Sequence, residues 1–194
     1  MLPVLKLITS NEGKLREMQH YLGPELEKIG VSLEKLSLEL LEIQGTSDEI
    51  IKDKLIRASQ VGNFAVICDD TSLCFSAWNG LPGPYIKHIK DAVGNEGLVN
   101  MLEQFQDKSA SAECRIGIKV PGKDPIIFTG ICEGDIVKPQ GENNFGWDPI
   151  FRPKGFDQTY AEIPLEIKND ISHRGKAMKL VVEYFQAHPN WIIS

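Results

Sequence analysis

The stretch FAVICDD, residues 64–70, constrains the fold most, because a short apolar run ends there abruptly in two carboxylates. Uninterrupted apolar runs of this length are typical of strands buried on both faces of a parallel sheet. Such a strand needs helices to cover it, and helical patterns precede and follow it. The sequence therefore predicts an α/β protein with polar side chains at the end of a buried strand.

Hydrophobic periodicity indicates the order of the other elements. We expect strands over residues 3–9, 31–40 and 64–70, the last continued by 71–78. We expect helices over residues 11–23, 46–62 and 95–105, and a final helix from Ser172 through Phe185. The second of these helices begins with a capping box, in which Thr46 is followed three residues later by Glu49.

The second half of the chain has a different pattern. Residues 111–120 and 125–137 alternate apolar and polar positions, which predicts an antiparallel hairpin. An aromatic loop at 145–151 and a polar loop at 153–170 follow the hairpin. We expect a mixed sheet, with parallel pairs early and antiparallel pairs later, in one domain over residues 1–194 with two closely joined lobes.

Composition limits the partners of the chain. A net charge of -6 argues against broad binding to nucleic acid, so a small anion would need local lysines, helix amino-termini or a divalent cation. The amino-terminal segment lacks the basic start and cleavage site of a signal peptide, and no apolar run approaches the roughly 20 residues of a membrane span. We expect a cytoplasmic protein without a membrane partner. The cysteines have no metal-binding spacing and are expected to be buried thiols: Cys68, Cys74, Cys114 and Cys132.

A candidate phosphate-binding loop lies in ITSNEGK, where a strand delivers Thr9, Ser10 and Asn11 to the start of a helix. Unpaired N–H groups and the helix dipole favour an anion there, and Lys14 stands one turn into the helix. The alternative is that Ser10 or Asn11 caps the helix and Lys14 is solvated. The loop is not a Walker A motif, because the leading glycine is absent.

The acidic pair Asp69 and Asp70 ends the buried strand, and the two side chains must point to opposite faces while the strand continues. Carboxylates at this position suit Mg²⁺, which prefers oxygen ligands. Glu42, in the loop after the second strand, is a further candidate ligand. The alternatives are a turn-forming Asp pair and an exposed Glu.

The aromatic loop FGWDPIF gathers Phe145, Gly146, Trp147 and Asp148. One interpretation is a hydrophobic plug, with Asp148 beginning a turn before Pro149. The other is a clamp for a flat ligand, in which the rings stack on its faces and the carboxylate contacts its edge.

A cationic cluster surrounds the start of the last helix in this acidic protein. Its members are Lys168, His173, Arg174 and Lys176. An arginine fork can hold two acceptor atoms in one plane, and His173 can donate or accept. The cluster therefore suits an anion or an acceptor-rich edge, with a solvated helix end as the alternative.

Five segments in order over residues 7–174 resemble the inosine triphosphate pyrophosphatase family, close to its eukaryotic members. They are ITSNEGK, EIQG with DEI, CDDTSLCFSAWNGLPGPYIK, NFGWDPIF with QTYAE, and KNDISHR. The resemblance implies an elongated mixed sheet flanked by helices, with a nucleotide cleft between two lobes. It also implies a homodimer that requires Mg²⁺, with Mn²⁺ able to substitute. The implied reaction hydrolyses ITP, dITP and XTP to the monophosphate and pyrophosphate, which removes non-standard purines from the nucleotide pool.

The resemblance also assigns residues by position. Asp70 and Lys14 become catalytic, and Glu42 and Asp70 bind the metal. Phosphate contacts fall to Thr9, Ser10, Asn11, Glu12, Gly13, Lys14, Lys54 and Lys87. Base contacts fall to Phe145, Gly146, Trp147, Asp148, Lys168, His173 and Arg174.

Two residues depart from the family pattern. Ser10 replaces a usual glycine, and Asp69 replaces a usual glutamate, but neither change removes an expected ligand. Whether Asp70 acts as base, metal ligand or both stays open. Two other functions are a pyrimidine-preferring pyrophosphatase of the septum-inhibitor type, disfavoured by FGWD and SHR, and a nucleotide sensor, disfavoured by Glu42 and Asp70.

Stacking on Phe145 and Trp147 contributes affinity but is nearly blind to base identity. Selection then depends on hydrogen bonds to the purine edge, where the 6-oxo group of hypoxanthine faces a donor such as Arg174. Asp148 either accepts from a ring N–H or holds Arg174 in place. No residue is identified that rejects guanine.

Overall fold

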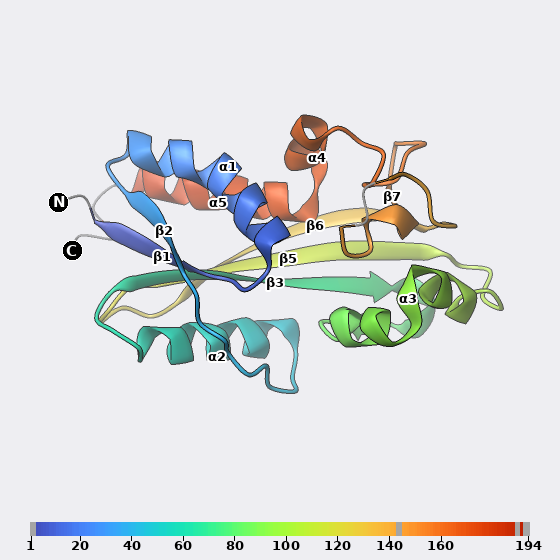
Figure 1. Cartoon of the computed structure of the whole chain (residues 1–194), viewed down its shortest axis with the longest axis horizontal. Coiled ribbons are helices and arrows are strands. Elements are labelled where there is room, and N and C mark those ends of the chain that lie inside the picture. Colours follow the sequence, from blue (N-terminus) through green and yellow to red (C-terminus); the bar gives the residue numbers. More distant parts are fainter. Residues whose placement is uncertain (1–2, 143–144, 189–190, 192–194) are drawn as a thin grey trace. The chain divides into compact units, whose positions relative to one another are not determined.

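The computed structural model describes residues 3–142, 145–188 and 191 (Figure 1). Its strands are β1 (Val4–Ile8), β2 (Ser32–Leu36), β3 (Ala65–Phe75), β4 (Pro82–Gly83), β5 (Ser109–Lys119), β6 (Ile126–Ile136) and β7 (Phe151–Pro153). Its helices are α1 (Glu12–Lys28), α2 (Ser47–Ser59), α3 (Ile86–Met101), α4 (Leu165–Ile171) and α5 (His173–Ala187), with short 3₁₀ turns η1 (Ser76–Trp78) and η2 (Asp148–Ile150). These elements make an α/β protein, as predicted.

The strands pair as one seven-stranded sheet in the order β2-β1-β3-β5-β6-β7, with β4 attached to β3. Contacts divide the chain into two compact units. The first unit comprises residues 1–70, 115–130 and 174–194, and the second comprises 71–114 and 131–173. The chain passes from one unit to the other within β3, β5 and β6 and after His173.

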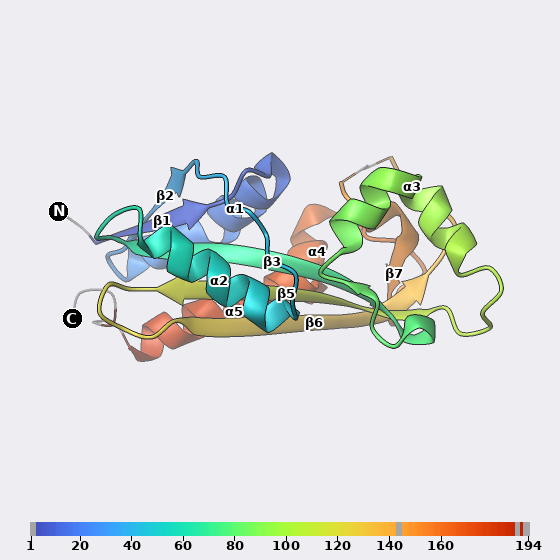
Figure 2. The same cartoon turned by 90° about the horizontal axis from the view of Figure 1, so that it is seen from below.

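In the first unit, β1 pairs in parallel with both β2 and β3, which confirms the expected parallel pairs. Helices α1 and α5 lie on one face of these strands and α2 lies on the other (Figures 1 and 2). The face of α2 packs against β1 and β3 through Ile51, Leu55, Ala58, Ile8, Val66 and Cys68. Gly117 of β5 permits this packing, because a Cβ there would lie 2.5 Å from the Leu55 side chain.

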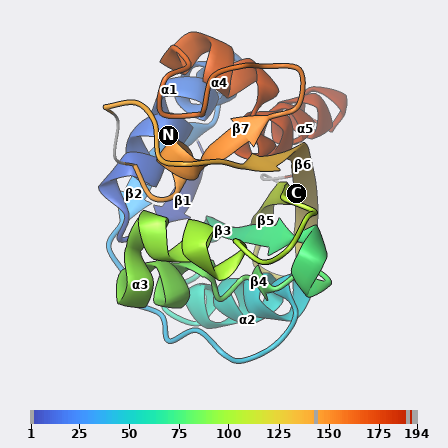
Figure 3. The ribbon, with the colours of Figure 1, turned by 90° about the vertical axis from the view of Figure 1, so that its right-hand side faces the viewer.

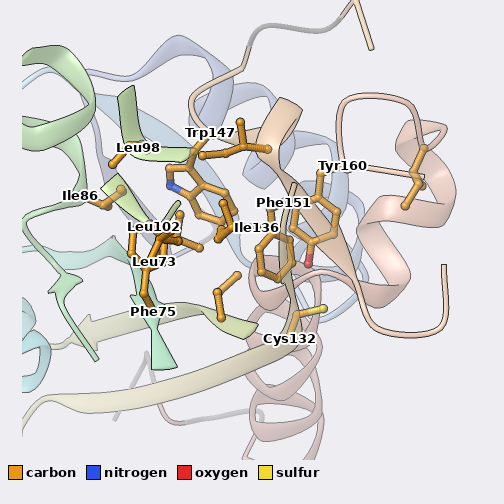
Figure 4. Packing of buried hydrophobic residues seen from close by; sticks show 14 residues of the cluster. Leu73, Phe75, Ile86, Leu98, Leu102, Cys132, Ile136, Trp147, Phe151 and Tyr160 are labelled. Atoms are coloured by element: carbon orange, nitrogen blue, oxygen red, sulfur yellow. The ribbon is translucent and has the colours of Figure 1, made fainter. Parts of the chain in front are cut away.

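In the second unit, β4 pairs antiparallel with β3, and β7 pairs antiparallel with β6. The backbone N–H of Ile136 donates to the carbonyl of Lys108, so the end of β6 lies beside the start of β5, as an antiparallel hairpin requires. A buried cluster joins residues of β3, α3, β6 and the loop around β7 (Figure 4). The second unit therefore has a hydrophobic core of its own.

Several expected elements have different bounds in the structure. Helix α1 does not end at Gly23 but continues through Pro24 to Lys28, because Leu26 extends its buried face and Gly23 has open space around it. Strand β2 ends at Leu36, short of the expected 31–40. Helix α3 begins at Ile86, nine residues before the expected 95. The segment expected as a polar loop contains α4.

The capping box expected at the start of α2 is confirmed. Thr46 and Glu49 form it, with each side chain accepting from the backbone N–H of the other residue. All four cysteines are free thiols; the expected burial is confirmed for Cys68, Cys114 and Cys132, whereas Cys74 is half-buried. No helix in the described part of the chain is long and apolar enough to cross a bilayer.

Candidate functional site

The acidic pair of β3 belongs to the first unit, and its two side chains have different partners. The Asp69 carboxylate contacts Lys14 of α1 and Arg174 of α5, whereas the Asp70 carboxylate contacts Lys54 of α2. Since α1 and α5 cover one face of the strands and α2 the other (Figure 3), the carboxylates point to opposite faces. This confirms the orientation expected from strand alternation.

A network of charges surrounds Asp69, which is 6% exposed. Lys14 Nζ lies 3.0 Å from Asp69 Oδ2, and Arg174 Nε and Nη2 each lie 3.4 Å from the same oxygen. Arg174 Nη1 also pairs with Glu17 of α1. Burial alone would raise the pKa of Asp69, but the charges of Lys14 and Arg174 lower it to about 2. Asp69 is therefore an anion at neutral pH and pairs with two cations.

Asp70 has a different electrostatic environment. Burial raises the pKa of its carboxyl more than the neighbouring charges of Lys54 and Lys14 lower it. Lys54 Nζ lies 2.6 Å from Asp70 Oδ1 and 2.7 Å from Glu42 Oε1. Burial lowers the pKa of Lys54, but the charges of Asp70 and Glu42 raise it overall, so the ammonium stays protonated. The structure thus brings Glu42, Lys54 and Asp70 together.

The fit of a divalent cation can be tested on this group. Asp70 Oδ2 is buried, and it has no hydrogen-bond partner among the described residues. A buried carboxylate oxygen without a donor is suited to a hard cation, which takes oxygen ligands. Within residues 3–142, 145–188 and 191, no cluster of three or more His, Cys, Asp or Glu side chains forms a complete metal site. Glu42 and Asp70 are the two carboxylates of this group, and both contact the Lys54 ammonium.

The expected phosphate loop is capped by its own residues. Asn11 Oδ1 accepts from the backbone N–H groups of Gly13 and Lys14 at 2.9 and 3.1 Å, and Thr9 Oγ1 accepts from the Asn11 N–H. Ser10 is exposed at the bend between β1 and α1. Asn11 is thus the cap of α1, as one of the two interpretations of this loop proposed.

The side chains of the first turn of α1 divide between surface and interior. Glu12 is exposed and pairs with Lys35, and the resulting charge interaction lowers its pKa. Lys14 is instead directed to Asp69. A phosphate at this loop would therefore compete with the Asn11 cap and with the Asp69 carboxylate.

The second unit brings together Asp148 and Lys168, which were predicted separately. Lys168 Nζ lies 2.6 Å from Asp148 Oδ2, and both side chains are buried. The same ammonium lies 5.1 Å from the ring centroid of Phe145 and 5.6 Å from that of Tyr160. Lys168 therefore joins the carboxylate of the aromatic loop to two aromatic faces.

Trp147 lies largely inside this unit, with 8% of its surface exposed. Its ring packs edge-on to Phe151 at 5.6 Å (Figure 4) and tilted against His173 at 5.3 Å. Tyr160 stacks on His173 at 5.9 Å, and Figure 4 shows its hydroxyl directed toward Cys132. Burial raises the pKa of Tyr160. Trp147 is thus packed into the hydrophobic core of this unit, whereas Phe145 of the same loop is half-buried.

The remaining expected residues of the second unit lie on its surface or in its loops. Lys87 is exposed in the first turn of α3. Gly146 has φ +58° and open space around it, a backbone conformation that favours glycine. Asn144 of the NFGWDPIF segment lies outside the described residues.

Two residues of these groups were missed by the reasoning from sequence. Glu17 lies one turn after Lys14 on α1, so helical spacing could have placed both on one face. Its partner Arg174, however, is 157 positions away in the chain. Tyr160 sits within QTYAE, and a lone tyrosine in a polar loop carries no signal that it is fully buried.

Most of the chain is similar to known proteins of one family. The model of the Ham1 family matches residues 5–184. The inosine triphosphate pyrophosphatase of Tuber melanosporum is 46% identical over 186 residues, which cover 95% of this chain and 98% of the relative.

Solved structures of similar proteins agree with the family match. A HAM1 protein from Coxiella burnetii superposes with a TM-score of 0.85 at 28% identity, covering 96% of this chain and 100% of that one. A nucleoside-triphosphatase, named as a dITP/XTP pyrophosphatase, from Mycobacterium abscessus superposes with a TM-score of 0.73 at 25% identity, covering 92% and 98%.

Proposed function

The chain belongs to the Ham1 family, and from this premise we propose that it hydrolyses ITP, dITP and XTP to the nucleoside monophosphate and pyrophosphate. The relative from Tuber melanosporum is named for the first of these substrates and that from Mycobacterium abscessus for the other two. The observation that carries the proposal is the pair of buried carboxylates at Asp69 and Asp70, each with its own lysine. The enzyme would remove non-standard purines from the nucleotide pool.

The first unit supplies the groups for phosphate hydrolysis. A triphosphate carries about four negative charges, which must be neutralised while a water is aligned opposite the leaving pyrophosphate. We assign Lys14 and Lys54 to the phosphate oxygens, with Thr9, Ser10, Asn11, Glu12 and Gly13 forming the loop around them. Asp69 keeps Lys14 in place through its 3.0 Å contact.

Asp70 is the group that we assign to the attacking water. Its pKa is raised by burial, which brings a carboxylate closer to the basicity that proton transfer needs. Its Oδ2 has no hydrogen-bond partner among the described residues, so this atom can either accept that proton or bind a cation. Glu42 and Asp70 would hold Mg²⁺ or Mn²⁺, which neutralises phosphate charge and lowers the pKa of bound water when present.

The second unit supplies the groups for the purine. We assign Phe145, Gly146, Trp147 and Asp148 to one side of the base and Lys168 and His173 to its edge. The paired Asp148 and Lys168 offer an acceptor and a donor side by side, which suits the ring N–H and the 6-oxo group of hypoxanthine. On the resemblance to the family, Arg174 is also assigned to the base and Lys87 to the phosphates.

We further propose that the two units act as joined lobes of one domain, which the continuity of β3, β5 and β6 through both units supports. A homodimer in the cytoplasm is proposed with them, on the resemblance to the family.

A substrate panel tests the proposed function. Purified protein with Mg²⁺ is incubated separately with ITP, dITP, XTP, ATP and GTP, and pyrophosphate, orthophosphate and monophosphate are measured. Pyrophosphate release from the first three, with slow turnover of ATP and GTP, is the expected result. Release of orthophosphate, or turnover of GTP as fast as ITP, contradicts the proposal.

A further inference from the structure

Helix α3 is broken at Gly94, and the residue after the break contacts the aromatic loop. Gly94 has φ 72° and ψ 178°, a backbone conformation outside the helical region, so a second helical segment begins at Asn95. The positive φ strains any other side chain at this position. The break therefore gives Asn95 a placement that an uninterrupted helix would not provide.

The side-chain amide of Asn95 makes a directed contact with this loop. Asn95 Nδ2 donates to the carbonyl oxygen of Gly146 at 3.2 Å. The orientation of the amide follows from chemistry, since Oδ1 in its place would face another acceptor. Asn95 Oδ1 is buried without a hydrogen-bond partner among the described residues. The hydrogen bond to the Gly146 carbonyl is thus the one that the structure describes for this amide.

The carbonyl oxygen that accepts this hydrogen bond belongs to Gly146, which stands between Phe145 and Trp147 in the chain. Gly146 joins Phe145 to Trp147 and itself has φ +58°, a backbone conformation that other residues rarely adopt. The loop is also closed by a bond from the Asp148 N–H to the Phe145 carbonyl at 3.0 Å. The turn that this bond closes contains Gly146, whose own carbonyl faces Asn95.

Hydrophobic packing also connects α3 to the aromatic loop. Leu98, one turn after Asn95 on α3, belongs to the buried cluster that contains Trp147. A shift of the second segment of α3 would therefore move both the packing and the hydrogen bond of the loop. Asn95 fixes the backbone, and Leu98 supports one ring.

We infer that Asn95 is a positioning residue for purine binding, which sets affinity for the base by holding Gly146 between the two rings. The inference rests on the proposed function, because it assigns the loop to the purine. Asn95 touches no group that we assign to phosphate hydrolysis. Loss of its amide should therefore raise KM and leave kcat unchanged.

The first test measures kinetics of Asn95→Ala and Asn95→Asp with ITP and Mg²⁺. Losing a neutral hydrogen bond should raise KM about threefold to tenfold, with kcat unchanged. Asp should be at least as damaging as Ala, because a carboxylate cannot donate to the Gly146 carbonyl. Asn95→Thr, whose hydroxyl can donate, should recover part of the affinity. The matched control is Asn100→Ala, an exposed asparagine on the same helix.

The second test needs no turnover. In a background with Trp78→Phe and Trp191→Phe, Trp147 is the remaining tryptophan, and its fluorescence reports the loop. Acrylamide should quench it more strongly in Asn95→Ala than in the background or in the Asn100→Ala control.

Failure of the inference and failure of the proposed function are distinguishable. Unchanged KM in Asn95→Ala and Asn95→Asp together with unchanged quenching in Asn95→Ala would overturn the inference, as would a fall in kcat at constant KM. A wild-type protein that leaves ITP intact would overturn the proposed function, whereas the quenching result would still test the loop contact.

Discussion

Lys54 Nζ lies 2.6 Å from Asp70 Oδ1 and directly bridges that carboxylate to Glu42. A single ammonium therefore contacts both carboxylates that we assign to a divalent cation. In the described structure, the positive charge beside Glu42 and Asp70 is therefore the ammonium of Lys54. A divalent cation at Glu42 and Asp70 must compete with the Lys54 ammonium, or it must bind after the Lys54 side chain has moved toward a phosphate.

Replacement of Lys54 by methionine tests this competition. The variant leaves Asp70 buried beside Glu42 without their shared cation, and loss of one partner of a buried ion pair destabilises a protein by about 3 to 5 kcal/mol. Mg²⁺ added without nucleotide should then raise the melting temperature of Lys54→Met more than that of wild type. Differential scanning calorimetry with and without Mg²⁺ measures both effects.

The matched control for this variant is Arg57→Met, which removes a half-exposed cation from the same helix and breaks only its pair with Asp53. Its response to Mg²⁺ should match that of wild type. An equal response in Lys54→Met and wild type would show that Lys54 does not compete for the cation.

Asp70→Asn should nearly abolish turnover while preserving the fold. The shape is kept, but the proton acceptor and one negative charge are lost, and such general-base groups contribute about 10²- to 10⁴-fold to rate. Because burial raises the pKa of Asp70, a neutral amide at this position avoids the penalty of a buried charge. Pyrophosphate release measures the activity, and urea unfolding measures the stability.

The exposed Asp91 offers a control of the same chemistry, since Asp91→Asn removes a charge from the surface of α3. Its kinetics should equal those of wild type. Full activity in Asp70→Asn would remove Asp70 from the mechanism.

Asp69 should make the stability of the protein depend on pH in the acidic range. The charges of Lys14 and Arg174 hold its pKa at about 2 in the folded state, below the ordinary value of 3.8, so the folded chain binds fewer protons between these values. The contribution is complete above pH 4 and is lost as the pH falls from about 4 to 2, amounting to about 2 kcal/mol.

Urea unfolding of wild type and Asp69→Asn at a series of pH values measures this effect. The difference in unfolding free energy should be constant near neutral pH and should shrink below about pH 4. A difference that stays constant down to pH 3, or grows, would contradict the depressed pKa.

The opposite orientation of Asp69 and Asp70 could be predicted because it depends only on strand alternation, a local property. The capping box of α2 could be predicted from the sequence for the same reason. The ion pair between Asp69 and Arg174 could not be predicted from the sequence, since Arg174 is 105 positions away and only the assembled first unit brings it near Asp69. Long-range ion pairs depend on tertiary packing, which periodicity does not encode.

The errors in element bounds have equally specific causes. Gly23 and Pro24 are helix-ending residues by local propensity, but burial of Leu26 continues α1 past them. Helix α4 was missed because seven residues carry too little periodicity to distinguish a helix from a loop. The sequence left plug and clamp open for Trp147, because its burial is decided by Phe151, Tyr160 and His173.

The aromatic loop allows affinity and selectivity to be separated. Phe145→Ala should raise KM for ITP and for ATP by the same factor, since a stacked ring is worth about 1 to 3 kcal/mol and contacts every purine alike. Asp148→Asn should instead change the ratio of kcat/KM between ITP and ATP, because it alters the acceptor that is paired with Lys168. Both variants are assayed for pyrophosphate release with both nucleotides. If Phe145→Ala changes that ratio as much as Asp148→Asn does, then the ring takes part in base selection and the assignment of selectivity to the edge is wrong.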